Sequence, residues 1–213
     1  MTFGLTYPQL KALDPCEEEF KAVCKALGGA RKWNGNLVTA QKARDAGVSF
    51  NNILWAASAM ARTDKELERR LRHFAADCAA RVLHFFEKER PDDERVRNAI
   101  QAAHDYADGK IDDAARVAAR VAAGGAAGAA AWDAARAAAW AAAGAAAWDA
   151  ARAAAWAAAG AAAGAAARDA ARAAAGAAAW VAAREWQFDR LIYWLSEDEP
   201  APLALPKKAQ VSA

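Results

Sequence analysis

Cysteine and long apolar runs are scarce in this chain of 213 residues. Its three cysteines, Cys16, Cys24 and Cys78, cannot all pair, and no Cys-x-x-Cys motif occurs, so neither a disulfide scaffold nor a zinc or redox site is indicated. The N-terminus lacks a basic stretch followed by an apolar one, which argues against a secretory signal and favours the cytoplasm. We therefore expect reduced cysteines that are buried as small hydrophobic side chains.

A long apolar segment is also missing. The longest uncharged stretch of the alanine-rich tract, residues 153–167, is shorter than the roughly 20 clearly apolar residues of a spanning helix, so we expect no membrane segment. Neither charge sign dominates, because 28 basic residues face 26 acidic ones and the net charge is +2. This balance gives no reason to expect DNA or an anionic membrane as a partner.

Motifs that carry chemistry are absent as well. The sequence contains no glycine-rich phosphate loop after a strand, no nucleophile elbow and no HExxH zinc signature. The acids Glu17, Glu18, Glu19, Asp92 and Asp93 stand at predicted helix starts, where capping and the helix dipole explain them. We therefore expect no enzyme activity, no catalytic residue, no cofactor and no metal.

Alanine is what the chain has in excess. There are 69 alanines in all, and 46 of the 70 positions in 114–183 are alanine. Alanine is the best helix former, so the composition predicts an all-α protein without a β-sheet. The predicted organisation is an N-terminal helical bundle over 1–110, an alanine-rich tract with a closing helix over 111–197, and a flexible proline-containing tail over 198–213.

Start and stop signals divide residues 1–110 into about five predicted helices. The first begins after Asp14 as N-cap and ends at the pair Gly28–Gly29. A short helix over 39–46 follows, and Ser49 is the predicted N-cap of the third helix.

The fourth predicted helix is the best defined. Thr63 and Glu66 match the capping box that opens it, and Pro91 marks its end. Asp92 is the predicted cap of the next helix, which ends at Gly109. The predicted apolar stripe of the fourth helix consists of Leu67, Leu71, Phe74, Ala75, Cys78, Val82 and Phe85.

Three possible metal ligands share one face of this fourth helix: His73, Asp77 and His84. The two histidines are separated by about 16 Å along the axis, so they cannot bind one ion. His73 and Asp77 would need ligands from elsewhere, and a solvated helix edge is the favoured interpretation.

Residues 116–184 follow a four-residue register in which every fourth position is Arg, Gly or Trp. Each four-residue step moves the Arg, Gly or Trp position by about 40° around a helix, so one straight helix would place Trp on every face. Several helices broken at glycines are the more economical alternative, and the mirror order of the register about Gly144 favours an antiparallel array. Both alternatives stay open, because lone glycines are tolerated in helices.

Within this register, Trp-x3-Arg-x3-Trp units place each arginine four residues from two tryptophans, where guanidinium and indole stack. One interpretation is a cleft that stacks a planar base and binds phosphate; the other is that Trp fills space beside Ala while Arg reaches water. The candidate ligand-binding residues are Trp132, Arg136, Trp140, Trp148, Arg152, Trp156, Arg168 and Arg172.

Several segments of the chain match the sequence pattern of a known family. They are Asp14–Phe20, Leu54–Ala56, Leu71–His84, Pro91–Asp93, Ala107–Gly109, the Ala/Trp/Arg tract and Glu185–Gln187. Together they resemble an alanine-rich family of bacteria and phages whose members are described as immunity proteins or as carrying an immunity-protein-five-like domain. The resemblance implies neutralisation of a toxic or defensive activity by binding rather than by catalysis.

Two functional hypotheses follow. The first is a cytoplasmic, non-catalytic immunity-like or counter-defence protein that neutralises a protein partner in conflict between bacteria and phages. The alternative is a sponge that sequesters an anionic nucleotide-like signalling molecule in an Arg/Trp-lined cleft, which a homo-oligomer could form between subunits.

Overall fold

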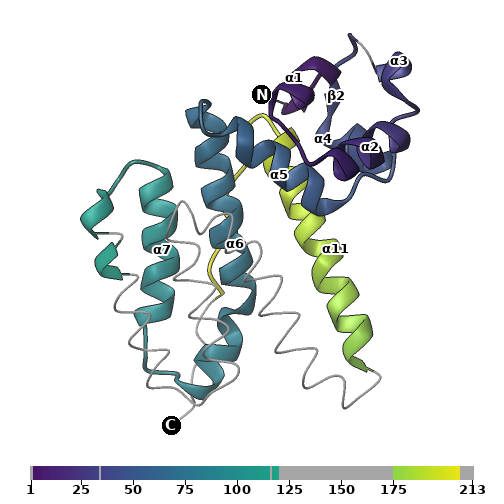
Figure 1. The fold of residues 1–213 in the computed structure, drawn as a ribbon. Coiled ribbons are helices and arrows are strands. Elements are labelled where there is room, and N and C mark those ends of the chain that lie inside the picture. Colours follow the sequence, from purple (N-terminus) through teal and green to yellow (C-terminus); the bar gives the residue numbers. More distant parts are fainter. Residues whose placement is uncertain (1, 34, 116, 120–174, 207–213) are drawn as a thin grey trace. The chain divides into compact units, whose positions relative to one another are not determined.

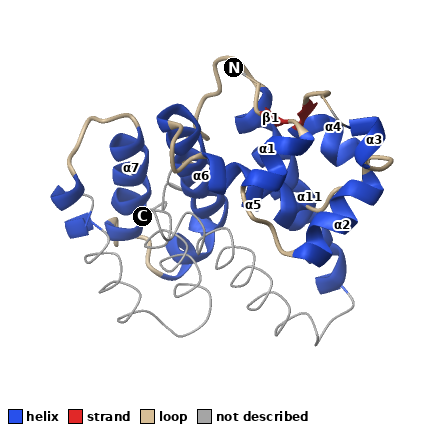
Figure 2. Cartoon of the chain, turned by 45° about the horizontal axis from the view of Figure 1, so that its top comes forward, coloured by secondary structure: helices blue, strands red, loops and turns tan. Residues whose placement is uncertain are grey.

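The computed structural model describes residues 2–33, 35–115, 117–119 and 175–206. Most of these residues are helical, as the composition predicts (Figures 1 and 2). The helices are α1 (Tyr7–Ala12), α2 (Glu17–Ala26), α3 (Ala30–Trp33), α4 (Ala40–Asp45), α5 (Phe50–Met60), α6 (Lys65–Glu89), α7 (Arg95–Ala107) and α11 (Ala175–Ser196). The predictions for the register between residues 120 and 174 lie outside the described residues.

The expectation that there is no β-sheet is wrong. Strands β1 (Gly4–Leu5) and β2 (Val38–Thr39) pair antiparallel, with Gly4 opposite Thr39 and Leu5 opposite Val38. A Cβ on Gly4 would lie only 2.9 Å from the carbonyl oxygen of Val38, so the close pairing requires glycine there. Two residues per strand are too few to give an alternating pattern in the sequence.

The predicted N-caps of α2 and α6 are displaced along the chain. Asp14 does not cap α2: it has a positive φ of 53°, and Cys16 stands at the N-cap position. In α6 the cap is Asp64 rather than Thr63, because Asp64 Oδ1 accepts the backbone N–H of Leu67 at 3.0 Å. Adjacent Asp and Thr residues are equally suited to this role, so composition alone does not choose between them.

Other helix ends follow the sequence closely. Ser49 caps α5 by accepting the backbone N–H of Asn52, as predicted. The first predicted helix stops at the glycine pair, where Gly28 and Gly29 have φ values of 81° and 92°.

Helix α7 combines a displaced start with a confirmed end. It begins at Arg95 with Glu94, not the predicted Asp92, at the N-cap position, and the backbone N–H of Arg95 donates to Asp93. Its last residue is Ala107, and the predicted terminator Gly109 follows the C-cap Asp108 with a φ of 70°, which favours glycine.

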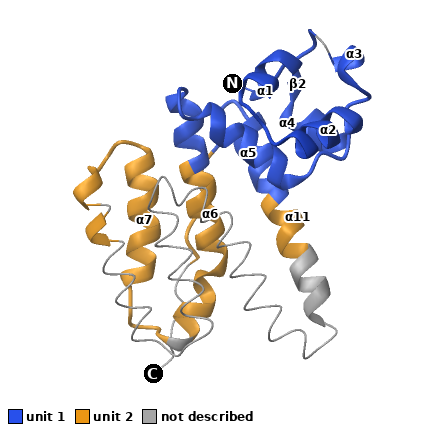
Figure 3. Ribbon diagram, viewed as in Figure 1, with its two compact units in different colours: residues 1–71, 188–200 blue, residues 72–187, 201–213 orange. Residues whose placement is uncertain are grey.

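The chain forms two compact units (Figure 3). Unit 1 comprises residues 1–71 and 188–200, and unit 2 comprises residues 72–187 and 201–213. The division therefore falls inside α6 and inside α11, while the predicted boundaries at residues 110 and 197 stay predictions. Composition follows the chain, but units follow contacts between distant segments.

Unit 1 joins its two chain segments by direct contacts. The backbone N–H of Phe3 donates to the carbonyl of Leu195 at 2.7 Å, and the ring of Phe188 meets that of Phe50 edge-on at 5.7 Å. Arg70 is buried and donates to the carbonyls of Trp194, Glu197 and Asp198, which cluster at the end of α11.

Unit 2 is built around the later turns of α6 and around α7. All of residues 72–80 are buried, and Leu83, Phe86, Val96 and Ile100 are completely enclosed. The predicted apolar stripe differs at two positions: Val82 is only half-buried while Leu83 is enclosed, and Phe85 is 50% exposed while Phe86 is buried in its place.

Candidate functional site

The eight candidate residues of the Trp/Arg register all lie outside the described residues. The structure therefore says nothing about whether Trp132, Arg136 and the other six form a cleft. Two features within the described residues carry the functional argument instead, an apolar pocket in unit 1 and a buried polar cluster in unit 2.

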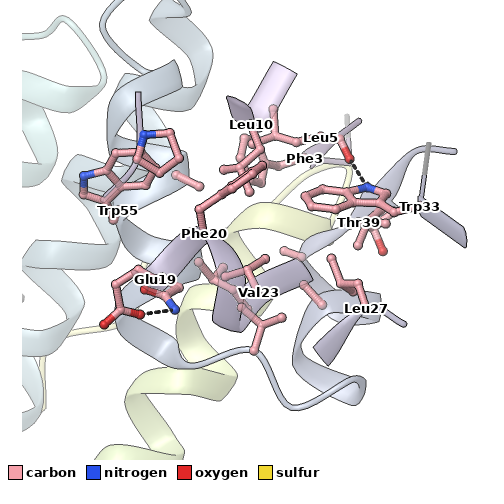
Figure 4. Close-up of a pocket in the computed structure, with 18 residues that line it drawn as sticks. Phe3, Leu5, Leu10, Glu19, Phe20, Val23, Leu27, Trp33, Thr39 and Trp55 are labelled. Carbon is pink, nitrogen blue, oxygen red and sulfur yellow. Dashed lines mark hydrogen bonds between the residues drawn. The ribbon is translucent and has the colours of Figure 1, made fainter. Parts of the chain in front are cut away.

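The pocket in unit 1 is partly open and has a volume of about 60 Å³. Its lining comes from short elements that lie far apart in the sequence, including Leu5 from β1, Phe20 and Val23 from α2, and Trp33 and Trp55 (Figure 4). Apolar side chains dominate this lining, which makes the pocket suitable for an apolar group.

The pattern of α2 explains why the pocket exists. Phe20, Val23 and Leu27 recur at helical spacing and face the pocket. Nevertheless, no residue of α2 is fully buried. This helix presents an apolar face that the rest of unit 1 covers only in part.

Aromatic contacts hold the walls of the pocket. The ring of Tyr7 packs against Phe20 at 5.4 Å and edge-on against Trp33 at 5.6 Å. The indole N–H of buried Trp33 donates to the carbonyl of Leu5 at 3.3 Å (Figure 4). These contacts fix the pocket before any ligand is present.

One carboxylate lies at the pocket. Glu19 is exposed, lines the pocket, and accepts a hydrogen bond at 2.8 Å from the amide of Asn52 (Figure 4). Within the described part of the chain Glu19 has no cationic partner, whereas its neighbour Glu17 forms an ion pair with Lys21. Sequence analysis assigned both acids to the helix start, where they do stand, and missed that one of them also faces the pocket.

The cysteines are free, as expected, but only one of them is buried. Cys78 is enclosed in unit 2, Cys24 is half-buried against the core of unit 1, and Cys16 is exposed. Burial raises the pKa of the Cys24 thiol, so this group is a poor nucleophile at neutral pH.

The polar cluster in unit 2 consists of His73, Asp77, His104 and Asp108. It overturns the interpretation of His73 and Asp77 as a solvated helix edge. Both side chains are completely buried. His84, on the same predicted face, is exposed, and its Nδ1 lies 3.0 Å from the carbonyl of Arg81. The face is therefore buried at one end of α6 and exposed further along.

A second histidine completes the cluster. His104 of α7 stacks on His73, with Nδ1 of one ring 2.8 Å from Nδ1 of the other. His73 Nε2 lies 2.8 Å from Asp108 Oδ1, and Asp77 Oδ1 accepts the backbone N–H of Leu203 at 2.6 Å. The cluster thus links α6, α7 and the segment after α11.

The hydrogen-bond network assigns the ring protons of the two histidines. If His73 Nε2–H donates to Asp108, then in a neutral ring its Nδ1 accepts, and His104 Nδ1–H donates to it. His104 Nε2 then carries a lone pair, which agrees with its lack of any hydrogen-bond partner among the described residues. It lies 3.7 Å from Asp77 Oδ1.

Burial lowers the pKa of His104 to about 4, although the nearby Asp77 acts in the opposite direction. Burial tends to raise the pKa of Asp108, but Lys110 and His73 outweigh that effect and lower it. His104 is therefore neutral at pH 7.

Over the described residues no group of three or more His, Cys, Asp and Glu side chains is arranged to hold a metal ion.

In the part of the chain that the structure describes, no helix has the length and apolar character needed to cross a membrane. Comparisons of the chain with protein-family models, curated proteins and solved structures gave no match. The pocket and the polar cluster are thus the observations from which function is inferred.

Proposed function

We propose that this protein neutralises a protein partner by binding it, without catalysis, in the conflict between bacteria and phages that its immunity-protein-like sequence pattern implies. The pocket of unit 1 receives an apolar side chain of that partner. The observation that carries this proposal is the preformed apolar lining around Phe20, Trp33 and Trp55.

Apolar pockets of this kind suit anchor residues at protein interfaces. Binding energy concentrates in a few side chains that enter well-packed, desolvated pockets. Burying one aliphatic side chain contributes about 1.5–3 kcal/mol. Since Tyr7, Phe20 and Trp33 are already held against one another, little ordering cost opposes binding.

The polar groups that could perform catalysis are engaged elsewhere. His73 and Asp77 are completely buried in unit 2, and His104 is only 4% exposed. His73 lies within hydrogen-bond distance of His104 and Asp108, and Asp77 accepts the backbone N–H of Leu203. A network of this kind stabilises the unit rather than meeting a substrate.

The alternative function, sequestration of an anionic nucleotide-like molecule, depends on residues such as Arg136 and Arg152. No contact of the described residues favours it, and it stays a prediction.

A variant with a filled pocket tests the proposal. Ala43 lines the pocket, and a leucine there would occupy much of its volume, whereas Ala22 is exposed on α2 and serves as the matched control. Tagged wild-type chain, Ala43→Leu and Ala22→Leu are cross-linked in a lysate of the source organism and the captured proteins are identified by mass spectrometry.

We expect one protein to be captured by the wild type and by Ala22→Leu, and at least tenfold less by Ala43→Leu. The purified partner should lose its own activity when the wild-type chain is added in excess. Equal capture by all three chains, or a partner whose activity is unaffected, would contradict the proposal.

A further inference from the structure

We propose that the pocket selects a branched aliphatic side chain that stands beside a cationic group, and that Glu19 receives the cation. This inference rests on the proposed function, because it names the chemistry of the partner segment that the pocket takes. The partner segment is thus a Leu or Ile residue next to Lys or Arg.

The volume of the pocket sets the size of the occupant. An apolar cavity of about 150 Å³ admits benzene, and the pocket of unit 1, at about 60 Å³, has less than half of that space. An aromatic ring therefore enters poorly. A four-carbon branched side chain matches the space between Phe20, Val23 and Trp55.

The charge of the pocket sets the neighbour of the occupant. Among the described residues that line the pocket, Glu19 is the only charged one. Asn52 engages one of its carboxylate oxygens, Oε2, at 2.8 Å and so holds the group in place. A cation that follows an apolar group into the pocket meets this carboxylate, while an anion is repelled.

The position of Glu19 differs from that of its neighbour on the same helix. Glu17 is paired with Lys21 and does not line the pocket. Loss of Glu17 should therefore leave the pocket unchanged, which makes it the matched control for Glu19.

Three small probes with the same branched carbon skeleton test the inference on the full chain. They are 3-methylbutan-1-amine, which is a cation at neutral pH, 3-methylbutan-1-ol, which is neutral, and 3-methylbutanoate, which is an anion. Each is titrated into the protein while the indole N–H signals of Trp33 and Trp55 are followed by two-dimensional NMR.

We expect the amine to bind about three- to tenfold more tightly than the alcohol, and the acid more weakly than both. Glu19→Gln should bring the amine to the level of the alcohol, whereas Glu17→Gln should keep the preference. Added salt should reduce the preference in the wild type.

Equal binding of amine and alcohol to the wild type would overturn the role of Glu19. Indole signals that do not respond to any probe, or that respond equally in Ala43→Leu, would overturn the aliphatic pocket. Because the probes require no partner, an amine-selective pocket without a captured protein would refute only the proposed function. If Ala43→Leu captures less partner but the amine and the alcohol bind the wild type equally, only the proposed cation beside the aliphatic side chain is refuted.

Discussion

The two units use their side chains differently. In unit 2 the residues of α6 from 72 to 80 are all buried, and four of them are alanines, whose small size lets neighbouring segments come close. In unit 1 no residue of α2 is fully buried, and the large side chains of Phe20 and of the C-cap residue Leu27 border a pocket. The buried stretch of α6 is packed without space, whereas the partly covered side chains at α2 leave space for another molecule.

The carboxylates of the two units show the same contrast. Asp77 is completely buried and accepts a backbone N–H from Leu203. Glu19 is exposed and accepts from the side chain of Asn52. We infer that the polar groups inside unit 2 maintain the structure, while Glu19 remains accessible to a partner.

The largest expected difference between the units is in the free energy of unfolding that is lost when a leucine is replaced by alanine in each of them. Leu83→Ala in unit 2 removes a completely buried side chain and should lower the free energy of unfolding by roughly 2–5 kcal/mol. Leu27→Ala in unit 1 should cost less than half as much, because Leu27 is half-exposed beside the pocket. Urea unfolding followed by circular dichroism measures both. Similar losses would show that the pocket wall is packed as tightly as the interior of unit 2.

Removing the carboxylates gives the second comparison. Asp77→Ala leaves the backbone N–H of Leu203 without this acceptor and breaks the buried cluster, so we expect a loss of about 3 kcal/mol. Glu19→Ala should change stability by no more than about 0.5 kcal/mol, because the carboxylate is exposed. Thermal unfolding at pH 7 distinguishes the two, and a mild effect of Asp77→Ala would refute a structural role for the cluster.

Acid should weaken unit 2 through His104. The pKa of this group is lowered from 6.5 to about 4 in the folded protein, so the unfolded chain binds the proton more readily. Stability is therefore complete above about pH 6.5 and falls as the pH is lowered toward 4. Between pH 7 and pH 5 the loss should be about 2 kcal/mol.

The variant His104→Asn tests this pH dependence, because Asn retains a donor near the position of Nδ1 but does not titrate. Its free energy of unfolding should change much less between pH 7 and pH 5, whereas the control His84→Asn, at an exposed histidine, should behave like the wild type. Glu66 and Asp93 have lowered pKa values, so they become protonated only below the range from pH 5 to pH 7 that this test uses. An unchanged slope in His104→Asn would refute the assignment.

These predictions depend on features that the sequence revealed unevenly. Periodicity and caps such as Ser49 located the principal helices of the described part, because such signals are local. The same periodicity misplaced Phe85, since a helix as enclosed as α6 buries residues on more than one face. The short pairing of β1 with β2 has no local signal, because it is formed between segments more than thirty residues apart.

The sites were harder to predict than the helices. His73 and Asp77 drew attention through their spacing, but their partner His104 lies on another helix, and only packing brings the two rings together. The only available signal was that His104 follows Ile100 by four residues, on the apolar face of α7. The pocket depends on how incompletely α2 is covered, and the sequence of α2 does not state what covers it.

The smallest expected effect comes from replacing an alanine with leucine. It gives the sharpest comparison, because the resulting change in the free energy of unfolding should have opposite signs in the two units. Ala43→Leu adds three carbons beside the pocket of unit 1, where there is space for them, and should raise the free energy of unfolding by up to about 1 kcal/mol. Ala79→Leu adds the same atoms to a completely buried position of α6 and should lower it by roughly 1–3 kcal/mol through overpacking.

Urea midpoints of the two leucine variants, measured with that of Ala22→Leu as the exposed control, decide the matter. A destabilised Ala43→Leu would mean that the pocket wall cannot admit an aliphatic group without strain, and the loss of partner binding in this variant would then have a structural explanation. A stabilised Ala43→Leu that no longer binds the partner would instead separate binding from folding. In that case the space beside α2, which costs unit 1 some stability, is retained because a partner fills it.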